Sequence, residues 1–206
     1  MILSDLLCAL ADLSAREARP EAAVTADALR AGAGTDFPAQ TPGTLAPGIL
    51  HTADLSDAHP AARLIRDAHD WLAWQDSPAA ALQPTSLSAI KSIVTLLGPG
   101  APIPSLTCLL GLYYQAPGTY YPLHAHNAAE TYTILAGTAD WQAGDWQAAD
   151  WQAGDRSFPV KVGRAIHHPP NIPHAMRAGP DGLLAIWRWS GDIGFDSYRM
   201  VPDPKA

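Results

Sequence analysis

The stretch "GTYYPLHAHNAAETYTILAG" (Gly118–Gly137) decides how the rest of this chain is interpreted. At its centre His124 and His126 stand two residues apart, and Glu130 follows four residues later. Side chains of a β-strand alternate between its two faces, so the two histidines share a face if this segment is a strand. A His-x-His pair with a nearby glutamate is sound ligand chemistry for a divalent first-row metal. The pattern therefore predicts a metal site on a β-structure.

The residues after His126 favour a β-hairpin. Residues 127–129 can form the turn. Glu130, Tyr132 and Ile134 would then share one face of the returning strand. If that face is the interior, two imidazoles, a carboxylate and a phenol converge. The other interpretation is the polar face of an exposed strand, without a ligand.

The composition argues against several classes of partner. The chain has 206 residues and a formal net charge of −7, without a run of basic residues, so we expect no nucleic-acid partner. No apolar stretch approaches the roughly 20 residues that span a bilayer, so we expect no membrane partner.

Asp5 and Asp12 interrupt the apolar opening segment, which predicts a helix rather than a signal peptide. Cys8 and Cys108 lack a CxxC partner and predict buried thiols in a reducing, cytoplasmic compartment.

Residues 1–87 have the pattern of a helical region. Apolar residues recur at helical spacing over residues 3–13. A second helix is predicted over residues 21–30, between Pro20 and Gly32.

A loop and a third helix complete this region. Residues 33–55 are rich in Pro, Gly and Thr and predict a loop. The helical pattern restarts after Pro60, which suits a first turn. The apolar face of this third helix consists of Ala61, Leu64, Ile65, Ala68, Trp71 and Leu72.

From about residue 88 the apolar segments become short and β-rich. They read "SIVTLL", "LTCLLGLYY", "TYTILAG" and "LLAIWRW", with turns at 117–118, 144–145 and 180–182 between them. Such a series predicts a sandwich or small barrel. The expected fold class is mainly β, with residues 1–87 as a helical region packed on a β-domain of residues 88–206.

One internal repeat, "DWQAGDWQAADWQAG", covers residues 140–154. Its three tryptophans could line an aromatic pocket. However, five is an odd period and a strand alternates every two residues, so Trp146 would face away from Trp141 and Trp151. The repeat is therefore interpreted as an expanded hairpin loop.

A metal held by this histidine pair and Glu130 needs a fourth ligand. His174, in "HHPPNIPHAM", is the candidate, because three prolines stiffen the segment around it. His167 and His168 compete with it, and spacing alone does not choose among the three.

The first stretch resembles the first motif of the cupins: Gly, five residues, His-x-His, three or four residues, Glu, six residues, Gly. Every fixed position matches, at Gly118, His124, His126, Glu130 and Gly137. The resemblance implies a single cupin, a small antiparallel β-barrel or jelly roll with the metal inside.

The second cupin motif matches in part. It runs Gly, five residues, Pro-x-Gly, two residues, His, three residues, Asn. Here Gly163, Pro169 and His174 match, which selects His174 as the fourth ligand. Asn171 replaces the middle Gly, and Asn is the next best residue where a turn needs a positive φ. Ala178 replaces the final Asn.

A narrower resemblance is to the cupin-type dimethylsulfoniopropionate (DMSP) lyases. It is carried by "YYPLHAHNAAETYTILAGTADW", "HHPPNIPHAM" and "LLAIWRWSGDIG". This resemblance implies a β-elimination that yields dimethyl sulfide and acrylate. A metal that binds the substrate carboxylate would stabilise the developing negative charge. The sulfonium is already a good leaving group, so one base is sufficient.

Tyr132 is the expected base, since a divalent cation lowers the pKa of a nearby phenol. Strand parity favours Tyr120 as a second pocket tyrosine, whereas the resemblance favours Tyr121, which is expected to assist catalysis and contact the substrate. Aromatic faces attract a methylated sulfonium, and Trp189 is the expected contact by resemblance. The alternative is that Trp187 and Trp189 simply pack against the helical region.

Two other functions remain open at this stage. An iron-dependent cupin dioxygenase could use the same four ligands, and a non-catalytic cupin could bind a small ligand. The His/Glu set accepts one divalent transition metal, which could be Fe, Zn, Mn, Co or Ni. A small-molecule substrate is the expected partner, and the sequence leaves the oligomeric state open, with a homodimer as one candidate.

Overall fold

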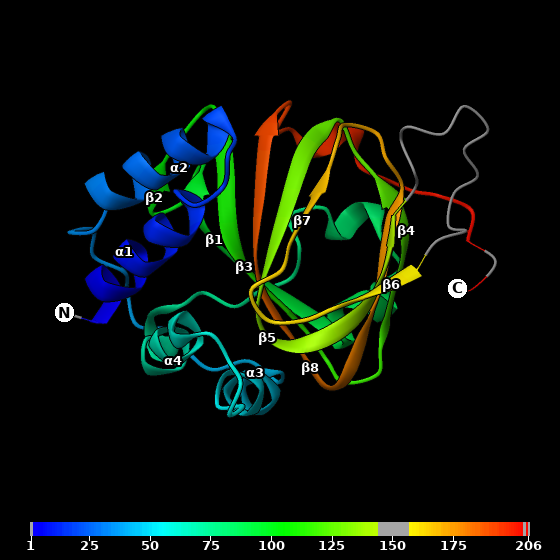
Figure 1. The fold of residues 1–206 in the computed structure, drawn as a ribbon, viewed down its shortest axis with the longest axis horizontal. Coiled ribbons are helices and arrows are strands. Elements are labelled where there is room, and N and C mark those ends of the chain that lie inside the picture. The colour runs from blue at the N-terminus through cyan, green and yellow to red at the C-terminus, as the bar shows by residue number, and fades with distance from the viewer. Residues whose placement is uncertain (1, 144–156, 204, 206) are drawn as a thin grey trace.

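The structure is a computed structural model, and it describes residues 2–143, 157–203 and 205. Helices occupy the first third of the chain and strands the rest, as the sequence predicted (Figure 1). The α-helices are α1 (Ile2–Ser14), α2 (Pro20–Ala31), α3 (Ala46–Ala53) and α4 (Pro60–Asp67). Short 3-10 turns follow at His69–Trp71, Ala80–Leu82 and Thr85–Ala89, and another lies at Phe195–Ser197.

One sheet contains all the strands that the structure describes. They are β1 (Lys91–Gly98), β2 (Ile103–Pro104), β3 (Cys108–Gln115), β4 (Tyr120–Ala125), β5 (Ala128–Ala143), β6 (Ser157–Val160), β7 (Ala165–His168), β8 (His174–Gly191) and β9 (Arg199–Met200). The order is β2-β1-β3-β8-β4-β9, and β5 pairs with β6, β7 and β8. The short β1–β2 pair is parallel and the other pairs are antiparallel. The sheet curls around an interior, but its pairing over these residues does not close, because β2 and β9 remain at its edges.

The predicted hairpin between the histidine pair and Glu130 is wrong. Among the described residues β4 pairs with β8 and β9, whereas β5 pairs with β6, β7 and β8. The first part of β8 lies between β4 and β5, so that His174 is opposite both His124 and Ala143. Long-range pairing with β8 therefore brings the two halves of the motif together.

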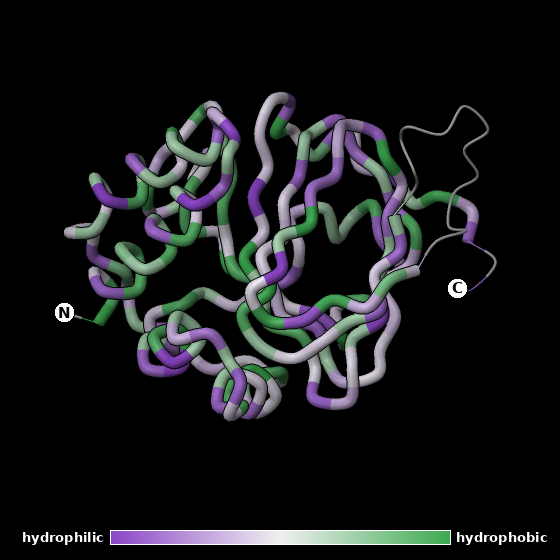
Figure 2. The backbone as a smooth tube through the Cα atoms, viewed as in Figure 1, coloured by the Kyte–Doolittle hydropathy of each residue, from purple (hydrophilic) through white to green (hydrophobic). Residues whose placement is uncertain are grey.

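The N-terminal helices cover the outer face of the sheet. On β3, Leu110, Leu112 and Tyr114 pack in one hydrophobic core with the helices, while Leu109 and Tyr113 belong to a second core inside the sheet. Both faces of β3 are buried for this reason. Hydrophobic and hydrophilic residues alternate along the helices (Figure 2), as expected for helices with one buried face.

The predicted loop over residues 33–55 contains helix α3, so that prediction was wrong for its second half. Pro47 and Gly48 in its first turn had favoured a loop. Pro is tolerated in a first turn, and a Cβ on Gly48 would collide with the Tyr114 hydroxyl. Close packing of α3 against β3 therefore overrides the local signal.

Other sequence expectations have mixed outcomes. Helix α2 is capped by Gly32 as predicted. On the third predicted helix, Leu72 is buried, whereas Trp71 is 37% exposed because a 3-10 turn replaces the last helical turn. Both cysteines are free, but only Cys108 is buried, and the expectation of a buried thiol is wrong for Cys8. In the part of the chain that the structure describes, no helix is long and apolar enough to cross a bilayer.

Candidate active site

A compact group of ligating side chains lies inside the curled sheet. One ligand atom each from His124, Glu130 and His174 lies within 4.8 Å of the others, and all three residues are buried. Direct pairing of His124 with His174 across β4 and β8 creates half of this group. Glu130 comes from β5, and its Oε2 lies 2.9 Å from His174 Nε2.

His126 joins this group through the same carboxylate. It follows the last residue of β4, and its Nε2 lies 3.2 Å from Glu130 Oε2. Its ring lies against the indole of Trp189, with centroids 4.1 Å apart. It stands outside the most compact three-residue group but offers its Nε2 to the same oxygen.

Backbone carbonyls fix the orientation of all three imidazoles. The Nδ1 of His124 bonds Pro122 O at 2.9 Å, that of His174 bonds Ile172 O at 2.9 Å, and that of His126 bonds Ala128 O at 3.1 Å. A carbonyl accepts, so Nδ1 carries the proton and Nε2 keeps its lone pair. This is the arrangement of metal-ligating histidines, whose second nitrogen usually donates to a carbonyl or carboxylate. The donor set thus fits one divalent transition metal.

Burial and charge set the protonation of this group. Burial, reinforced by neighbouring His174, holds the pKa of His124 well below its usual value, which keeps the imidazole neutral. Burial alone would raise the pKa of Glu130. However, when His126 and His174 carry a proton on Nε2, their charges and hydrogen bonds outweigh burial and hold the pKa of Glu130 well below its usual range. A metal bound to Nε2 would take the place of these protons. Neutral imidazoles and an ionised carboxylate are the forms that bind a metal.

The structure separates the three competing histidines of the second motif. His167 bonds Thr131 Oγ1 at 3.1 Å and is only partly buried. His168 is buried behind His174, with parallel rings 4.1 Å apart, and accepts a hydrogen bond from Trp141 Nε1. Of the three, only His174 belongs to the group of ligand atoms. Asn171 has a φ of 65°, as expected from its place in the motif.

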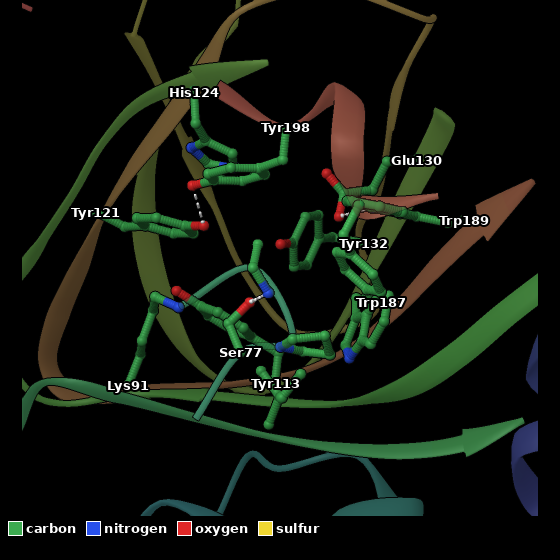
Figure 3. Close-up of a pocket in the computed structure, with 14 residues that line it drawn as sticks. Ser77, Lys91, Tyr113, Tyr121, His124, Glu130, Tyr132, Trp187, Trp189 and Tyr198 are labelled. Atoms are coloured by element: carbon green, nitrogen blue, oxygen red, sulfur yellow. Dashed lines mark hydrogen bonds between the residues drawn. The ribbon is translucent and has the colours of Figure 1, made fainter. Parts of the chain in front are cut away.

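A cavity of about 30 Å³ adjoins the cluster, with room for about two water molecules. Its walls are Ser77, Pro78, Ala79, Lys91, Ile93, Tyr113, Tyr121, His124, Glu130, Tyr132, Trp187, Trp189, Phe195 and Tyr198 (Figure 3). Half of these side chains are Tyr, Trp or Phe, and they come from strands and connecting segments far apart in the sequence.

Tyr121, and not Tyr120, lines this pocket. The pairing of β4 with β8 shifts between Tyr121 and His124, so residues three apart face the same side there. Tyr121 stacks on His124 with centroids 4.1 Å apart, and its hydroxyl lies 2.8 Å from that of Tyr198. Tyr120 instead bonds the Asp203 carboxylate at 2.7 Å. The prediction from strand alternation, which favoured Tyr120, was wrong because this shift in the pairing is a β-bulge.

Tyr132 lies at the centre of the pocket, and its hydroxyl points into the cavity (Figure 3). It pairs with Trp187 on β8, and its ring meets the edges or faces of Tyr113 and Trp141 at 5.5 and 4.9 Å. Burial, with the nearby Glu130 carboxylate, raises the pKa of Tyr132 well above its usual value. Without a cation beside it, this phenol is therefore neutral.

Trp187 and Trp189 line the pocket instead of packing against the helices. Trp189 Nε1 donates a hydrogen bond to Glu130 Oε1 at 2.7 Å, so this indole also holds the carboxylate. The two indoles meet edge to face with centroids 5.9 Å apart. Phe195 extends the aromatic wall at 4.8 Å from Trp189.

Sequence reasoning missed Lys91, Tyr113, Phe195 and Tyr198 as pocket residues. Tyr113 alternates with the outward Leu112 and Tyr114 on β3, a signal that was available. Lys91 stands at the start of a strand, where a lysine usually reaches solvent. Phe195 and Tyr198 lie in an irregular segment without any period.

The repeat lies mostly outside the described residues. Its first copy ends β5, and the indole of Trp141 is fully buried between Tyr132 and His168. Strands β5 and β6, on either side of the segment, pair antiparallel from Gln142 and Ser157. Residues 144–156, which hold the other copies and the predicted loop, are not among the described ones.

Comparisons with known proteins identify the family of this chain. The profile of the dimethylsulfoniopropionate lyase family matches residues 44–185. The dimethylsulfoniopropionate lyase DddQ of Ruegeria pomeroyi (strain ATCC 700808 / DSM 15171 / DSS-3) is 31% identical over 108 residues. That match covers 52% of this chain and 49% of DddQ, so it spans about half of the relative's length.

Two solved structures share the fold over nearly the whole chain. The crystal structure of DMSP lyase DddQ from Ruegeria pomeroyi DSS-3 has a TM-score of 0.68 at 23% identity and covers 98% of each chain. A chain from the crystal structures of the DMSP lyases RdDddP and RnDddQII has a TM-score of 0.65 at 23% identity, over 97% of this chain and 100% of that one. The expected fold class, a mainly β cupin with N-terminal helices, is confirmed, and by the match over residues 44–185 the chain belongs to the dimethylsulfoniopropionate lyase family.

Proposed function

We propose that this protein is a metal-dependent carbon-sulfur lyase that cleaves dimethylsulfoniopropionate to dimethyl sulfide and acrylate. The observation that carries the proposal is the position of Tyr132. Its hydroxyl enters the aromatic pocket beside a cluster whose donor atoms suit a divalent metal. A base beside a metal, in a pocket of aromatic rings, fits a cationic substrate that must lose a proton.

The proposed ligands are His124, His126, Glu130 and His174. The carbonyl bonds to all three Nδ1 atoms, which leave Nε2 free, support this set. When bound, a divalent transition metal would supply positive charge that favours ionised Tyr132 and stabilises the negative charge developing on the substrate. The metal could be Fe, Zn, Mn, Co or Ni, because the donor types alone do not discriminate among them.

Tyr132 is the proposed base. As phenolate it accepts the proton from the substrate carbon next to the carboxylate. The electron pair of that C–H bond forms the C=C bond of acrylate as the C–S bond breaks, and dimethyl sulfide leaves with the electrons of that bond. The pocket itself raises the pKa of Tyr132, so the reaction depends on the neighbouring positive charge to lower it.

Two aromatic groups are proposed to bind the substrate. Trp189 offers an indole face to the sulfonium, since aromatic faces attract methylated cations by roughly 0.5–2 kcal/mol each. Tyr121 is fixed by its contact with His124 and by hydrogen bonds to Tyr198 and Gln83. It is proposed to contact the substrate and to assist in catalysis from the opposite wall.

The cavity is too small for the substrate as it stands, so a wall must move on binding. Pro78 and Phe195 line both this cavity and a surface groove of about 580 Å³. We therefore place the entrance between the segments that hold these two residues.

The experiment is a headspace assay for dimethyl sulfide after dimethylsulfoniopropionate is added to pure protein. We expect stoichiometric dimethyl sulfide and acrylate in air and under nitrogen alike, and loss of both after chelation of the metal. Product formation that requires oxygen would instead indicate a dioxygenase. Binding without turnover would indicate a non-catalytic cupin.

A further inference from the structure

Two buried aromatic side chains lie behind the metal cluster, and the chemistry described so far does not use them. His168 is the last residue of β7, and Trp141 lies on β5 in the first copy of the repeat. The exposed fraction is 1% for His168 and 0% for Trp141. Neither residue lines the cavity, and neither belongs to the group of ligand atoms. Any influence on the site therefore acts through the residues that they touch.

The hydrogen bond between these two side chains fixes the orientation of the His168 ring. An indole N–H can only donate, so its 3.0 Å bond to His168 Nε2 shows that this nitrogen carries the lone pair. The two ring planes differ by 10° and the centroids are 5.8 Å apart, so the rings lie edge to edge in nearly one plane. Trp141 thus sets the plane of His168 and occupies the nitrogen that would otherwise face a metal.

His168 in turn supports the proposed ligand His174. The two rings are parallel to within 7°, with centroids 4.1 Å apart. The bond from His174 Nδ1 to Ile172 O holds one nitrogen of that ring but does not by itself fix the tilt of the ring. The face of His168 prevents this tilt on one side, because a close-packed interior leaves no room for it. The direction of His174 Nε2 therefore depends on both contacts.

Trp141 also touches the proposed base. The ring of Tyr132 meets the indole at a centroid distance of 4.9 Å and an angle of 62°. One indole therefore contacts the base on one side and, on the other, the ring that lies behind the metal ligand. A displacement of Trp141 would change the positions of Tyr132 and His174 together.

We propose that Trp141 and His168 are positioning residues, which together hold His174 in the ring plane that a metal requires and Tyr132 at a fixed place beside that metal. This inference rests on the proposed metal site and base. It deepens the proposed function, because the phenolate forms only next to the positive charge of the metal. The repeat thereby contributes one indole to the site, behind the ligands rather than in the wall of the pocket.

The test measures Co²⁺ affinity by competition with a chelator, together with the visible absorption of bound Co²⁺, which reports the geometry of its ligands. His168→Leu removes the acceptor, Trp141→Phe removes the donor, and His168→Gln keeps an acceptor near the position of Nε2. We expect His168→Leu and Trp141→Phe to lose about tenfold or more in Co²⁺ affinity, with a changed spectrum. His168→Gln should recover most of the affinity and the spectrum of the parent.

Trp74→Phe is the matched control. Its indole Nε1 is also buried, but it has no partner in the part of the chain that the structure describes, and its ring packs in the helical core. This variant should keep the Co²⁺ affinity and spectrum of the parent. If it loses both as Trp141→Phe does, the loss reflects removal of a buried indole in general, and the proposal is wrong.

The variant that combines Trp141→Phe with His168→Leu tests whether the two residues act as one unit. Its loss of Co²⁺ affinity should equal the larger of the two single losses, because both substitutions break the same bond. Additive losses would overturn the proposal, since they would indicate two independent packing defects. Parent-like affinity and spectrum in His168→Leu would overturn it as well. That comparison, with His168→Gln beside it, decides the matter even if Trp141→Phe does not fold.

Turnover separates this inference from the proposed function. With dimethylsulfoniopropionate and saturating metal, kcat of Trp141→Phe should fall by about tenfold or more while KM changes little, because the base is displaced and the pocket wall is kept. A parent protein that binds no Co²⁺ would refute the proposed metal site. A parent site that every variant retains unchanged would refute only the positioning role. The Co²⁺ measurements hold even if the protein does not act on this sulfonium.

Discussion

The two faces of the same sheet carry different chemistry. Toward the helices, β3 and β8 present Leu110, Leu112, Leu184 and Ile186, which pack in an aliphatic core. Toward the interior, the alternate residues of β8 include Trp187 and Trp189, and β3 contributes Tyr113. The outer face is mostly aliphatic, with Arg188 as a buried charge, whereas the inner face holds imidazoles, a carboxylate, phenols and a lysine.

This difference shows how one set of strands can be both scaffold and site. The outer core buries apolar area and stabilises the fold by the hydrophobic effect. The inner face then tolerates polar groups whose burial costs free energy, because the other side of each strand is already fixed. We therefore expect substitutions on the inner face to change metal binding or catalysis, and those on the outer face to change stability.

The largest expected effect is loss of the metal. His174→Ala removes a donor from the buried cluster, and metal affinity should fall by more than about a hundredfold, beyond the 10–100-fold typical of groups that only support a ligand. His126→Ala should also lose much of its metal. Elemental analysis after dialysis measures both. His167→Ala is the matched control. His167 lies on the face of β7 opposite to His168 and bonds Thr131, so this variant should keep its metal. Full metal occupancy in His174→Ala would contradict the assignment of the metal site to the inner face of the sheet.

The next effect concerns the base. Tyr132→Phe preserves the ring that packs between Tyr113 and Trp141. We expect cooperative unfolding and metal content near those of the parent, but a loss in kcat on the order of a hundredfold or more. Exchange of the substrate α-proton, followed by NMR in deuterated water, should be suppressed as well. Release of dimethyl sulfide close to the parent rate would contradict this role, and Tyr121 would be the next base to test.

On the outer face, Leu110→Ala should leave the chemistry intact. Leu110 is fully buried beneath the helices, so the substitution should lower the free energy of unfolding by about 2–5 kcal/mol. Leu106→Ala is the control, because Leu106 is 86% exposed and should change stability by less than about 0.5 kcal/mol. Chemical denaturation measures both. A large change in the metal content of folded Leu110→Ala would show that the two faces are not separable.

Local patterns predicted much of this molecule. The helical spacing in residues 1–87, the β-rich segments and the cupin motif located α1, α2 and α4, the sheet and the ligand candidates. Asn171 was correctly expected at a positive φ, because few other residues replace Gly in such a turn.

What failed depended on contacts distant in sequence. The hairpin prediction failed because β8 pairs with β4 and β5 and separates them. The alternation of side chains along a strand had favoured Tyr120 over Tyr121 as the pocket residue. That prediction was wrong because β4 contains a bulge, for which Pro122 is the only signal in the sequence. Helix α3 forms against Tyr114, more than sixty residues away. Lys91 was not predicted as a pocket residue, because its burial is due to Tyr121 and the segment before β1. Periodicity in the sequence does not indicate such a contact.

Arg188 has a consequence for how this chain can be recombined. It lies on the outer face of β8, buried between Glu17 at 2.6 Å and Thr131 Oγ1 at 3.1 Å, and Thr131 stands between Glu130 and Tyr132. An exchange of residues 1–87 for the helices of a distant relative could rebuild the aliphatic contacts with many different side chains. It would leave the guanidinium of Arg188 without a carboxylate unless an acid stood at the position of Glu17, which bonds it, or of Glu21, which lies 3.9 Å from it. A library of chimaeras should therefore retain Glu17 with Arg188 or replace both.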